Sequence, residues 1–266
     1  MTSTARVIAD SVNPDGQRIT TLQLRYWRAI HAEFMTHRKF SRNASSSRAI
    51  PVRKMLAQVW NDPAGPEHWG ANQAGMQARG ELAGWRLTAA QTLWRAAGRA
   101  MCGAAWAAMK LGLHKQVANR LLEPWQFISV VVTATEWENF FALRDHSDAQ
   151  PEIRDLAQAM RTAMRASTPA ALKWGEWHLP YAHRARPECG SEVRRSLVAS
   201  SARCARVSYL THDGRATTEE EDQSLWSRLA DANPPHMSPF EHQAYAHQGQ
   251  HANFEGWRSY RHLLGK

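Results

Sequence analysis

The stretch from Phe127 to Thr133, F-I-S-V-V-V-T, constrains the fold of this chain more than any other segment. Successive side chains of a strand point to opposite faces of a sheet. Because this stretch is apolar and β-branched at positions of both kinds, a strand formed here must be buried on both sides. The sequence therefore predicts a central strand of a sheet over these residues.

The other patterns predict further strands and several helices. Residues 4–12 and 18–26 alternate apolar and polar across an Asn-Pro-Asp-Gly turn, which predicts a β-hairpin. Thr135 and Glu138 have the spacing of a capping box, and Asp148 and Pro151 are expected in the cap and first turn of the next helix. Helices are expected over residues 27–34, 52–60, 81–111, 114–122, 136–143, from 151 onward, 191–205 and 217–230; the segments 61–78 and 167–187 are expected to be irregular.

Composition limits the class of protein. A length of 266 residues suits one domain spanning residues 1–266, and the formal charge of +9 favours an anionic partner such as a nucleotide, a polyanionic cofactor or nucleic acid. The three cysteines are too widely spaced for a disulfide framework or a C-x-x-C site, which favours a reducing cytoplasm. No run approaches the roughly 18 apolar residues of a membrane span, so no membrane partner is expected.

The stretch from Met35 to Pro51, M-T-H-R-K-F-S-R-N-A-S-S-S-R-A-I-P, is the strongest candidate for a binding site. It contains three arginines, a lysine, a histidine and four serines and has no acidic residue. Such a dense set of uncompensated donors suits a multiply charged anion such as a phosphate. The alternative is a solvated basic loop.

The same stretch resembles the signature of the flavin-dependent thymidylate synthases of the ThyX type. That signature is Arg-His-Arg, seven residues, Ser, any residue, Arg, and this chain has His37-Arg38, seven residues, Ser46 and then Arg48. Thr36 stands in place of the first arginine. No dinucleotide-binding, Walker, nucleophile-elbow or H-E-x-x-H motif is present to favour another family.

Two further segments resemble conserved regions of that family. Asn139, Arg144 and the A-Q-x-E-I-R run of residues 149–154 resemble its second region, although Thr135 and Asp148 replace an arginine and a histidine. The resemblance implies that Arg144 binds the substrate nucleotide and acts in catalysis, and that Asn139 lies at the flavin. An ordinary amphipathic helix pair is the alternative.

The segment from His236 to His242, H-M-S-P-F-E-H, resembles the family's H-x-[S/T]-P-F-E-H element. The resemblance implies that His236 and Ser238 contact the flavin and that Ser208, in the preceding A-R-V-S-Y, contacts a flavin phosphate. Residue types alone would also allow a metal cluster or a surface histidine tail formed with His247 and His251.

Two weaker likenesses complete the comparison. Arg120, four residues before a proline, resembles an arginine that contacts the nucleotide, and a surface arginine at a helix end is the alternative. The tail from Asn253 to Arg261 resembles that of longer, phage-like members. Short members carry the H-x-[S/T]-P-F-E-H block before the arginine signature, so the motif order of this chain looks circularly permuted.

The resemblance implies an α/β fold with a mixed or antiparallel sheet flanked by long helices, in a homotetramer that binds FAD between subunits. It further implies that NADPH reduces the flavin, that methylenetetrahydrofolate supplies carbon and that dUMP becomes dTMP. His37 and Arg38 would contact the flavin; Arg38, Ser46, Arg48 and Arg120 would bind substrate. Ser46 would bind phosphate or ribose and would not attack carbon.

Two alternatives remain open from the sequence. The charge, the arginine-rich patches and the twelve tryptophans also fit a nucleic-acid-binding protein, but this class does not explain the paired motifs, and no specific nucleic acid is expected. Thr36 and Asp148 also allow methylation of another uridine nucleotide. The tryptophans at positions 85, 94 and 106 favour packing in a core or subunit interface over a ligand platform.

Overall fold

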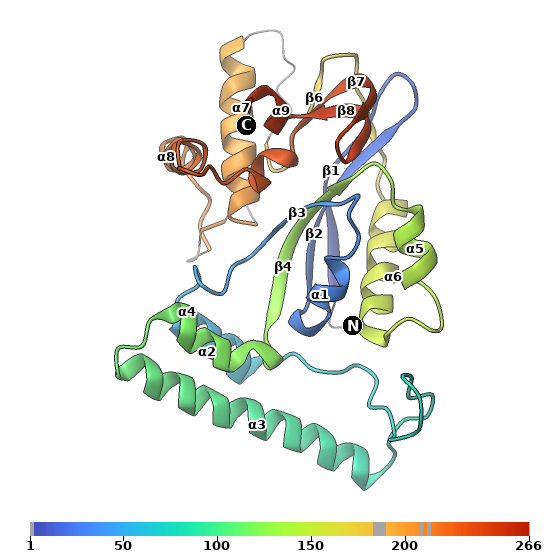
Figure 1. The fold of residues 1–266 in the computed structure, drawn as a ribbon, viewed down its shortest axis with the longest axis vertical. Helices are drawn as coiled ribbons and strands as arrows, with labels where there is room; N and C mark the ends of the chain where they lie inside the picture. The colour runs from blue at the N-terminus through green and yellow to red at the C-terminus, as the bar shows by residue number, and fades with distance from the viewer. Residues whose placement is uncertain (1–2, 183–189, 208–209, 212–213, 266) are drawn as a thin grey trace.

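The computed structural model describes residues 3–182, 190–207, 210–211 and 214–265. Its main element is a mixed five-stranded sheet in the order β3-β4-β2-β1-β5, in which only the pairing of β1 with β5 is parallel (Figure 1). The strands are β1 Thr4–Val12, β2 Arg18–Trp27, β3 Ser41–Ala44, β4 Phe127–Ala134 and β5 Ala170–Ala171. The predicted hairpin is confirmed as β1 and β2, and the predicted α/β fold with a mixed sheet is confirmed.

Strand β4 is an interior strand that is buried on both faces, as its sequence predicts. Ile128, Val130 and Val132 face one side and join the largest apolar core, which α6 covers with Ile153 and Leu156. On the other side, Val131 packs against Cys204 and Val207. Helices α5 Glu138–Arg144 and α6 Pro151–Arg165 lie together beside the sheet (Figure 1).

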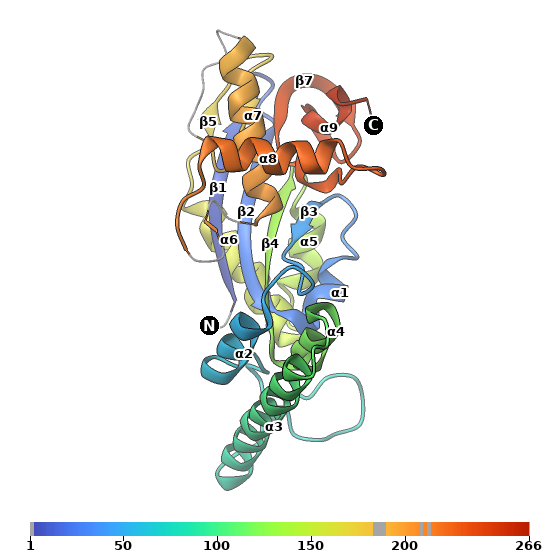
Figure 2. The ribbon, with the colours of Figure 1, turned by 90° about the vertical axis from the view of Figure 1, so that its left-hand side faces the viewer.

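The second face of the sheet carries a smaller sheet and two helices. The three-stranded sheet has the order β6-β7-β8, and α7 and α8 lie at the same end of the molecule (Figure 2). These elements are β6 Trp177–His178, β7 Ala244–His251, β8 Phe254–Ser259, α7 Gly190–Ala205 and α8 Glu219–Ala230.

A buried polar chain joins the two sheets. The hydroxyl oxygens of Thr21 in β2 and Thr133 in β4 are hydrogen-bonded at 2.7 Å. Thr21 bonds Nε2 of His178 at 2.8 Å, and Thr133 bonds Nδ1 of His242 at 2.9 Å. Both histidines are almost fully buried, so polar side chains fill the space between the sheets.

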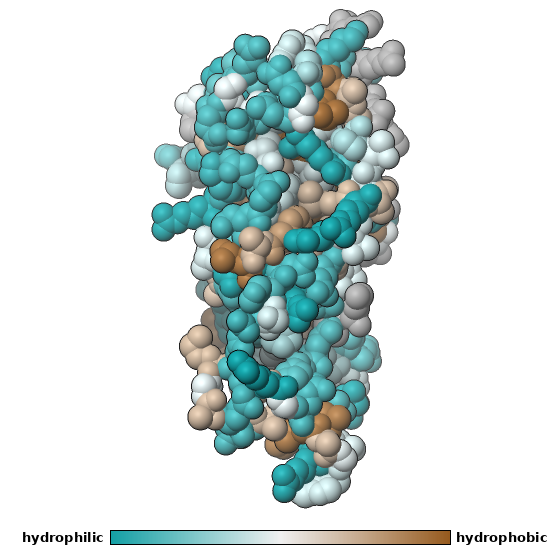
Figure 3. Space-filling model, turned by 90° about the vertical axis from the view of Figure 1, so that its right-hand side faces the viewer, coloured by the Kyte–Doolittle hydropathy of each residue, from teal (hydrophilic) through white to brown (hydrophobic). Residues whose placement is uncertain are grey.

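Between β3 and β4 the chain makes a long helical excursion. It contains α2 Val52–Asn61, α3 Trp85–Lys110 and α4 Lys115–Ala118, and α3 crosses one end of the molecule (Figures 1 and 2). Cys102 and Ala105 of α3 pack against Met55 and Val59 of α2. The opposite side of α3 is exposed, with Trp85, Leu93 and Trp106 more than half accessible. The face shown in Figure 3 is mainly hydrophilic, with separate apolar patches that include one at its lower end.

The remaining elements are short. They are α1 His31–Phe34, α9 Tyr260–Leu263 and 3-10 helices over Arg28–Ile30, Asn119–Trp125 and Ser238–Glu241. No helix in the described part of the chain is both long and apolar enough to cross a membrane.

Two local predictions are wrong. Helix α5 begins after Trp137 without a side-chain cap, and the Thr135 hydroxyl accepts a hydrogen bond from the Glu255 amide at 3.2 Å instead of forming the capping box. Gln150, not Asp148, is the N-cap of α6, while Pro151 takes the first helical position as expected. A capping box does form at α8, between Thr218 and Glu221.

Candidate functional site

The structure brings together His37 and Arg144, which the sequence places in two separate motifs. Arg144 is the last residue of α5, and its Nε donates to Nε2 of His37 at 2.9 Å. Its Nη1 pairs with the carboxylate of Glu33 on α1. Burial, aided by the nearby charges of Arg144 and Arg42, lowers the pKa of His37 to about 4. A neutral His37 can therefore accept the hydrogen bond that fixes the orientation of Arg144.

Arg42 shapes the loop that carries His37. Its Nη1 donates to the backbone carbonyls of Met35 at 2.8 Å and His37 at 2.9 Å. Its Nε is buried without a partner in the described part of the chain, and burial lowers its pKa. Sequence reasoning counted Arg42 only as one more positive charge, because nothing in the signature marks it as a residue that positions the loop.

Asn43 connects the basic stretch to the H-M-S-P-F-E-H segment. Its amide donates to the carbonyls of Cys204 at 2.8 Å and Ala205 at 3.3 Å, at the end of α7. Its Oδ1 accepts from the hydroxyl of Ser238 at 3.2 Å, although 195 residues separate the two. Three sequence regions that resemble family motifs therefore meet around β3. Asn43 was missed because it lies inside the seven unspecified positions of the signature.

Five further predicted site residues are exposed at the surface. Arg38, Arg48, Asn139 and His236 are exposed, and their side chains make no hydrogen bond or ion pair to the residues described. The Ser46 hydroxyl is also exposed and accepts from the Arg48 amide at 3.3 Å, as a serine that caps a turn does. These side chains are free donors at the molecular surface.

Arg120 lies next to Asn119, whose amide donates to the carbonyls of Ser47 at 2.7 Å and Ile50 at 2.9 Å in the basic stretch. It belongs to the 3-10 helix Asn119–Trp125 at the end of the excursion, and its Nη1 pairs with Glu123 at 2.6 Å. Arg28 contacts the same carboxylate at 2.9 Å. Among the residues described, the Arg120 side chain makes no hydrogen bond or ion pair with another predicted site residue.

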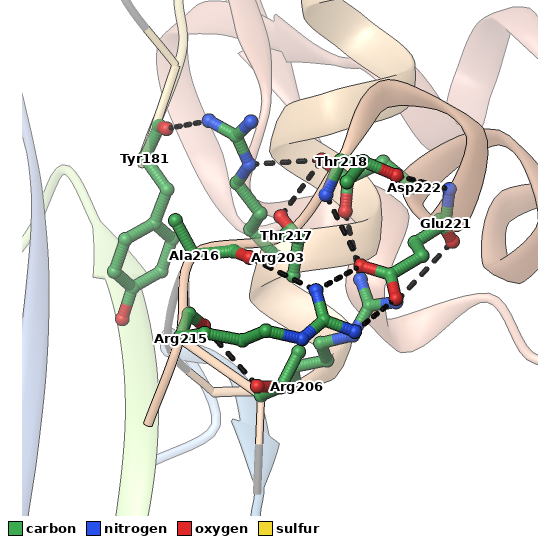
Figure 4. Close-up of polar contacts among 10 residues, drawn as sticks. Tyr181, Arg203, Arg206, Arg215, Ala216, Thr217, Thr218, Glu221 and Asp222 are labelled. Atoms are coloured by element: carbon green, nitrogen blue, oxygen red, sulfur yellow. Dashed lines mark hydrogen bonds and ion pairs between the residues drawn. The ribbon is translucent and has the colours of Figure 1, made fainter. Parts of the chain in front are cut away.

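The arginines next to the A-R-V-S-Y stretch are neutralised by the acidic start of α8 (Figure 4). Ser208 itself lies outside the described residues. Asp222 is 1% exposed and accepts from Arg206 at 2.8 Å and from Arg203 at 3.0 Å. Glu221 pairs with Arg215. This network ties α7 to α8 and fixes the segment that leads to Ser208.

The histidines do not form a metal centre in the described part of the chain. No group of three or more histidine, cysteine, aspartate or glutamate side chains is placed there to hold a metal ion. His242 is buried against Thr133, whereas His236 is exposed. His247 and His251 contact each other, with Nδ1 and Nε2 2.9 Å apart. The metal-cluster alternative therefore has no support among these residues.

The predicted residues around β3 are mainly exposed at the surface. A cavity of about 280 Å³ lies beside them, lined by Ser41 of β3 and Glu241 of the H-M-S-P-F-E-H segment. An open surface with free guanidinium groups can bind a phosphate, but it cannot by itself exclude water from a reaction.

Comparison with solved structures finds distant similarities. The chain is similar to a UMP/dUMP methylase, PolB, from Streptomyces cacaoi in two structures, one bound with 5-Br dUMP (TM-score 0.47, 14% identity, 61% of this chain and 89% of that chain) and one with 5-Br UMP (0.49, 15%, 61% and 88%). It is also similar to Thymidylate Synthase X from Helicobacter pylori with FAD and dUMP (0.38, 16%, 55% and 67%).

A family model gives the decisive comparison. No curated protein matches the chain. The model described as "Thymidylate synthase complementing protein" matches residues 19–170, which is more than half of the chain and includes the regions around His37 and Arg144. The chain belongs to the thymidylate synthase complementing protein family.

Proposed function

We propose that this protein is a flavin-dependent enzyme that methylates dUMP at C5 to give dTMP, with methylenetetrahydrofolate as the carbon donor and NADPH as the reductant. Family membership supports the class of reaction. The observation that carries the proposal is the 2.9 Å contact of Arg144 with His37, because it joins two motif regions 107 residues apart in one site.

The nucleotide phosphate would be held by guanidinium groups. Arg38 and Arg48 are exposed and have no acidic partner among the residues described. Arg144 already uses Nε and Nη1 for His37 and Glu33, so Nη2 is the nitrogen that remains for a nucleotide. Charge-assisted hydrogen bonds of this kind are stronger than those between neutral groups. The planar guanidinium group of arginine can also donate two parallel hydrogen bonds to a phosphate.

Ser46 would position the substrate and not act as a nucleophile. A serine nucleophile needs a base within hydrogen-bond reach. The only hydrogen bond of its hydroxyl within the described ranges comes from the Arg48 amide. This arrangement lets the hydroxyl contact phosphate or ribose but gives it no group to take its proton.

The donors around β3 fit the phosphates and ring edges of FAD. Arg42 has a buried Nε without a partner, and His236 and Asn139 present polar groups at the surface near Ser238 and Arg144. We propose that Asn139, His236 and Ser238, together with His37 and Arg38, bind and orient FAD, and that Ser208 contacts one of its phosphates. FAD, when bound, supplies the hydride and carbon-transfer chemistry.

The open surface around β3 supports completion of the site by another subunit. A water-excluded site strengthens electrostatic interactions with the reacting groups. Because Arg38, Arg48, Asn139 and His236 are exposed, we propose a homotetramer with active sites between subunits, built from a single domain with permuted motif order.

A titration of dUMP into the FAD-loaded protein tests the proposal. Arg144→Gln should raise the dissociation constant of dUMP about tenfold to hundredfold, because a hydrogen bond to a charged group contributes about 1.5–3 kcal/mol. The exposed Arg165 at the end of α6 provides a matched control, since Arg165→Gln should change nothing. Equal dUMP affinity of Arg144→Gln and the parent protein would contradict the assignment, as would a colourless protein unable to take up FAD.

One observation favours a second candidate, the methylation of another uridine nucleotide. Thr36 replaces the first arginine of the signature, and its hydroxyl donates to the Glu33 carbonyl at 2.7 Å. The guanidinium group that the family signature has at this position is therefore absent from this chain. Titration of UMP beside dUMP decides between the candidates, because a tighter complex with UMP would identify the ribonucleotide as substrate.

A further inference from the structure

A cavity of about 620 Å³ lies in the helical excursion, away from the residues assigned to the flavin and nucleotide. It is formed by the end of α2, the loop that follows it and one side of α3. Its volume falls in the range of about 300–1,000 Å³ that is typical of small-molecule sites. The side chains that matter for binding are three tryptophans, two arginines and a glutamine.

Tryptophan rings supply the apolar surface of the cavity. Trp94 is fixed from both sides, because its Nε1 donates to the Ala64 carbonyl at 2.9 Å and its ring packs against Trp125. Trp69 meets Trp94 edge to face, with ring centroids 6.4 Å apart. Gly65 allows this close packing, since a Cβ there would lie 2.6 Å from Trp94 Nε1. Trp60 is 52% exposed and leaves a ring available for stacking.

Positive charge lines the same cavity. Arg95 and Arg99 lie four residues apart on α3, so both guanidinium groups project from one side of the helix. Neither has an acidic partner in the described part of the chain, and Arg99 lies 5.5 Å from the centre of the Trp60 ring. Gln91, one turn earlier, adds an amide to the same wall.

The acidic groups of the cavity leave these cations available. Asp62 already pairs with Arg25, at 2.5 Å, and no ion pair joins Arg95 or Arg99 to an acidic side chain among the residues described. Helix α3 has no acidic residue from Trp85 to Lys110. The cavity therefore combines π faces, two adjacent cations and a few groups that can accept hydrogen bonds from a heterocycle.

We infer that this cavity binds a planar heteroaromatic anion of the nucleoside monophosphate class. The ring stacks against Trp60 and Trp69, the phosphate is held by Arg95 and Arg99, and Gln91 bonds to the edge of the base. Stacking on tryptophan and bidentate arginine contacts are the two interactions that recognise such ligands. This site is separate from the one proposed around β3 and does not depend on its function.

Calorimetric titration of AMP into the parent protein and into Arg144→Gln, which weakens the nucleotide site proposed around β3, tests the inference. AMP bound in the cavity should be unaffected by Arg144→Gln, whereas AMP bound around β3 should be weakened. AMP should bind, and Arg95→Gln and Arg99→Gln should each weaken it tenfold or more. Trp60→Ala should weaken AMP and adenosine alike, because it removes stacking and leaves the phosphate contacts.

Arg86→Gln is the matched control, because Arg86 lies on the same helix but does not line the cavity. It should leave AMP binding unchanged. The inference is overturned if the parent protein does not bind AMP, or if AMP binds equally well to the parent protein and to the Arg95→Gln and Arg99→Gln variants. Binding of a single-stranded oligonucleotide without binding of AMP would also overturn it, since the site would then recognise a nucleic acid and not a mononucleotide.

Discussion

Acid should destabilise the fold through two histidines, His178 and His242, that lie between the sheets. Burial lowers the pKa of each from 6.5 to about 3. Asp10 opposes the shift of His178, and His178 adds to that of His242, but burial is the largest cause for both. Both side chains are therefore neutral in the folded protein at any pH near neutrality.

The sign of the effect follows from proton linkage. In the unfolded chain each imidazole takes up a proton as the pH falls through 6.5, whereas in the folded chain it does so only near pH 3. The unfolded state binds more protons over this interval, so stability that is present above pH 7 is lost as the pH falls from about 6.5 towards 3. At about 1.36 kcal/mol per pKa unit, each histidine lowers the free energy of unfolding by about 2 kcal/mol between pH 7 and pH 5.

Urea unfolding at pH 7, 6 and 5 measures this loss. His178 and His242 together should account for about 4 kcal/mol of the loss in the parent protein, to which His31 and His37 add, because burial lowers the pKa of each to about 4. His242→Asn places an amide near the position of Nδ1, keeps the bond to Thr133 and should reduce the loss by about 2 kcal/mol. His146, which is exposed, serves as the control through His146→Asn. The same dependence on pH in the parent and in His242→Asn would refute the reasoning.

Three further outcomes are expected. Ser46→Ala should weaken dUMP binding yet retain turnover at saturating dUMP, and mass spectrometry of the parent should find no adduct on Ser46; an adduct there would overturn the flavin-centred mechanism. Replacing both His236 and Ser238 by alanine should lower FAD retention, measured by absorbance after gel filtration, while EDTA has no effect; recovery by zinc would support a metal site instead. Asp222→Asn should lower the free energy of unfolding by about 3 kcal/mol, because two arginines lose their buried partner; a loss below about 1 kcal/mol in urea unfolding would show that solvent screens this pair.

The elements that the sequence predicts well are those with a strong local pattern. The first hairpin has regular alternation and a Pro-Asp-Gly turn, and β4 has an unbroken apolar run. Strand β3, S-R-N-A, has neither feature and exists because Arg42 and Asn43 pair with β4. Its strand conformation is set by tertiary contacts, which local propensity does not contain.

The hairpin of β7 and β8 was missed for a related reason. Strand β7 reads A-Y-A-H-Q-G-Q-H, so only its first half alternates between buried and exposed positions. Its turn uses Ala252 at φ +52°, where sequence reasoning expects glycine or asparagine. Glycine is required at position 256 of β8 because the neighbouring side chains leave no space: a Cβ there would lie 1.7 Å from an oxygen of Gln17.

The site could be predicted in part. The signature indicated His37 and the second conserved region indicated Arg144, but neither motif contained a sign that the two side chains touch. The pairing of Arg144 with Glu33 joins residues 111 positions apart and depends on how α1 and α5 pack. Sequence patterns locate chemical groups, whereas the contacts among them arise from tertiary packing.

In the helical excursion between β3 and β4, the two ends of the segment from Ala64 to Trp125 lie side by side, because the Ala64 amide donates to the Trp125 carbonyl at 2.9 Å. The segment between these two residues therefore begins and ends at the same place beside the sheet. The entropy of closing a loop rises only with the logarithm of its length, so doubling the loop costs about 0.6 kcal/mol. A change in the length of this segment should therefore have little effect on the pairing of β2 with β4, provided that Asn119 keeps its hydrogen bonds to the Ser47 and Ile50 carbonyls of the basic stretch.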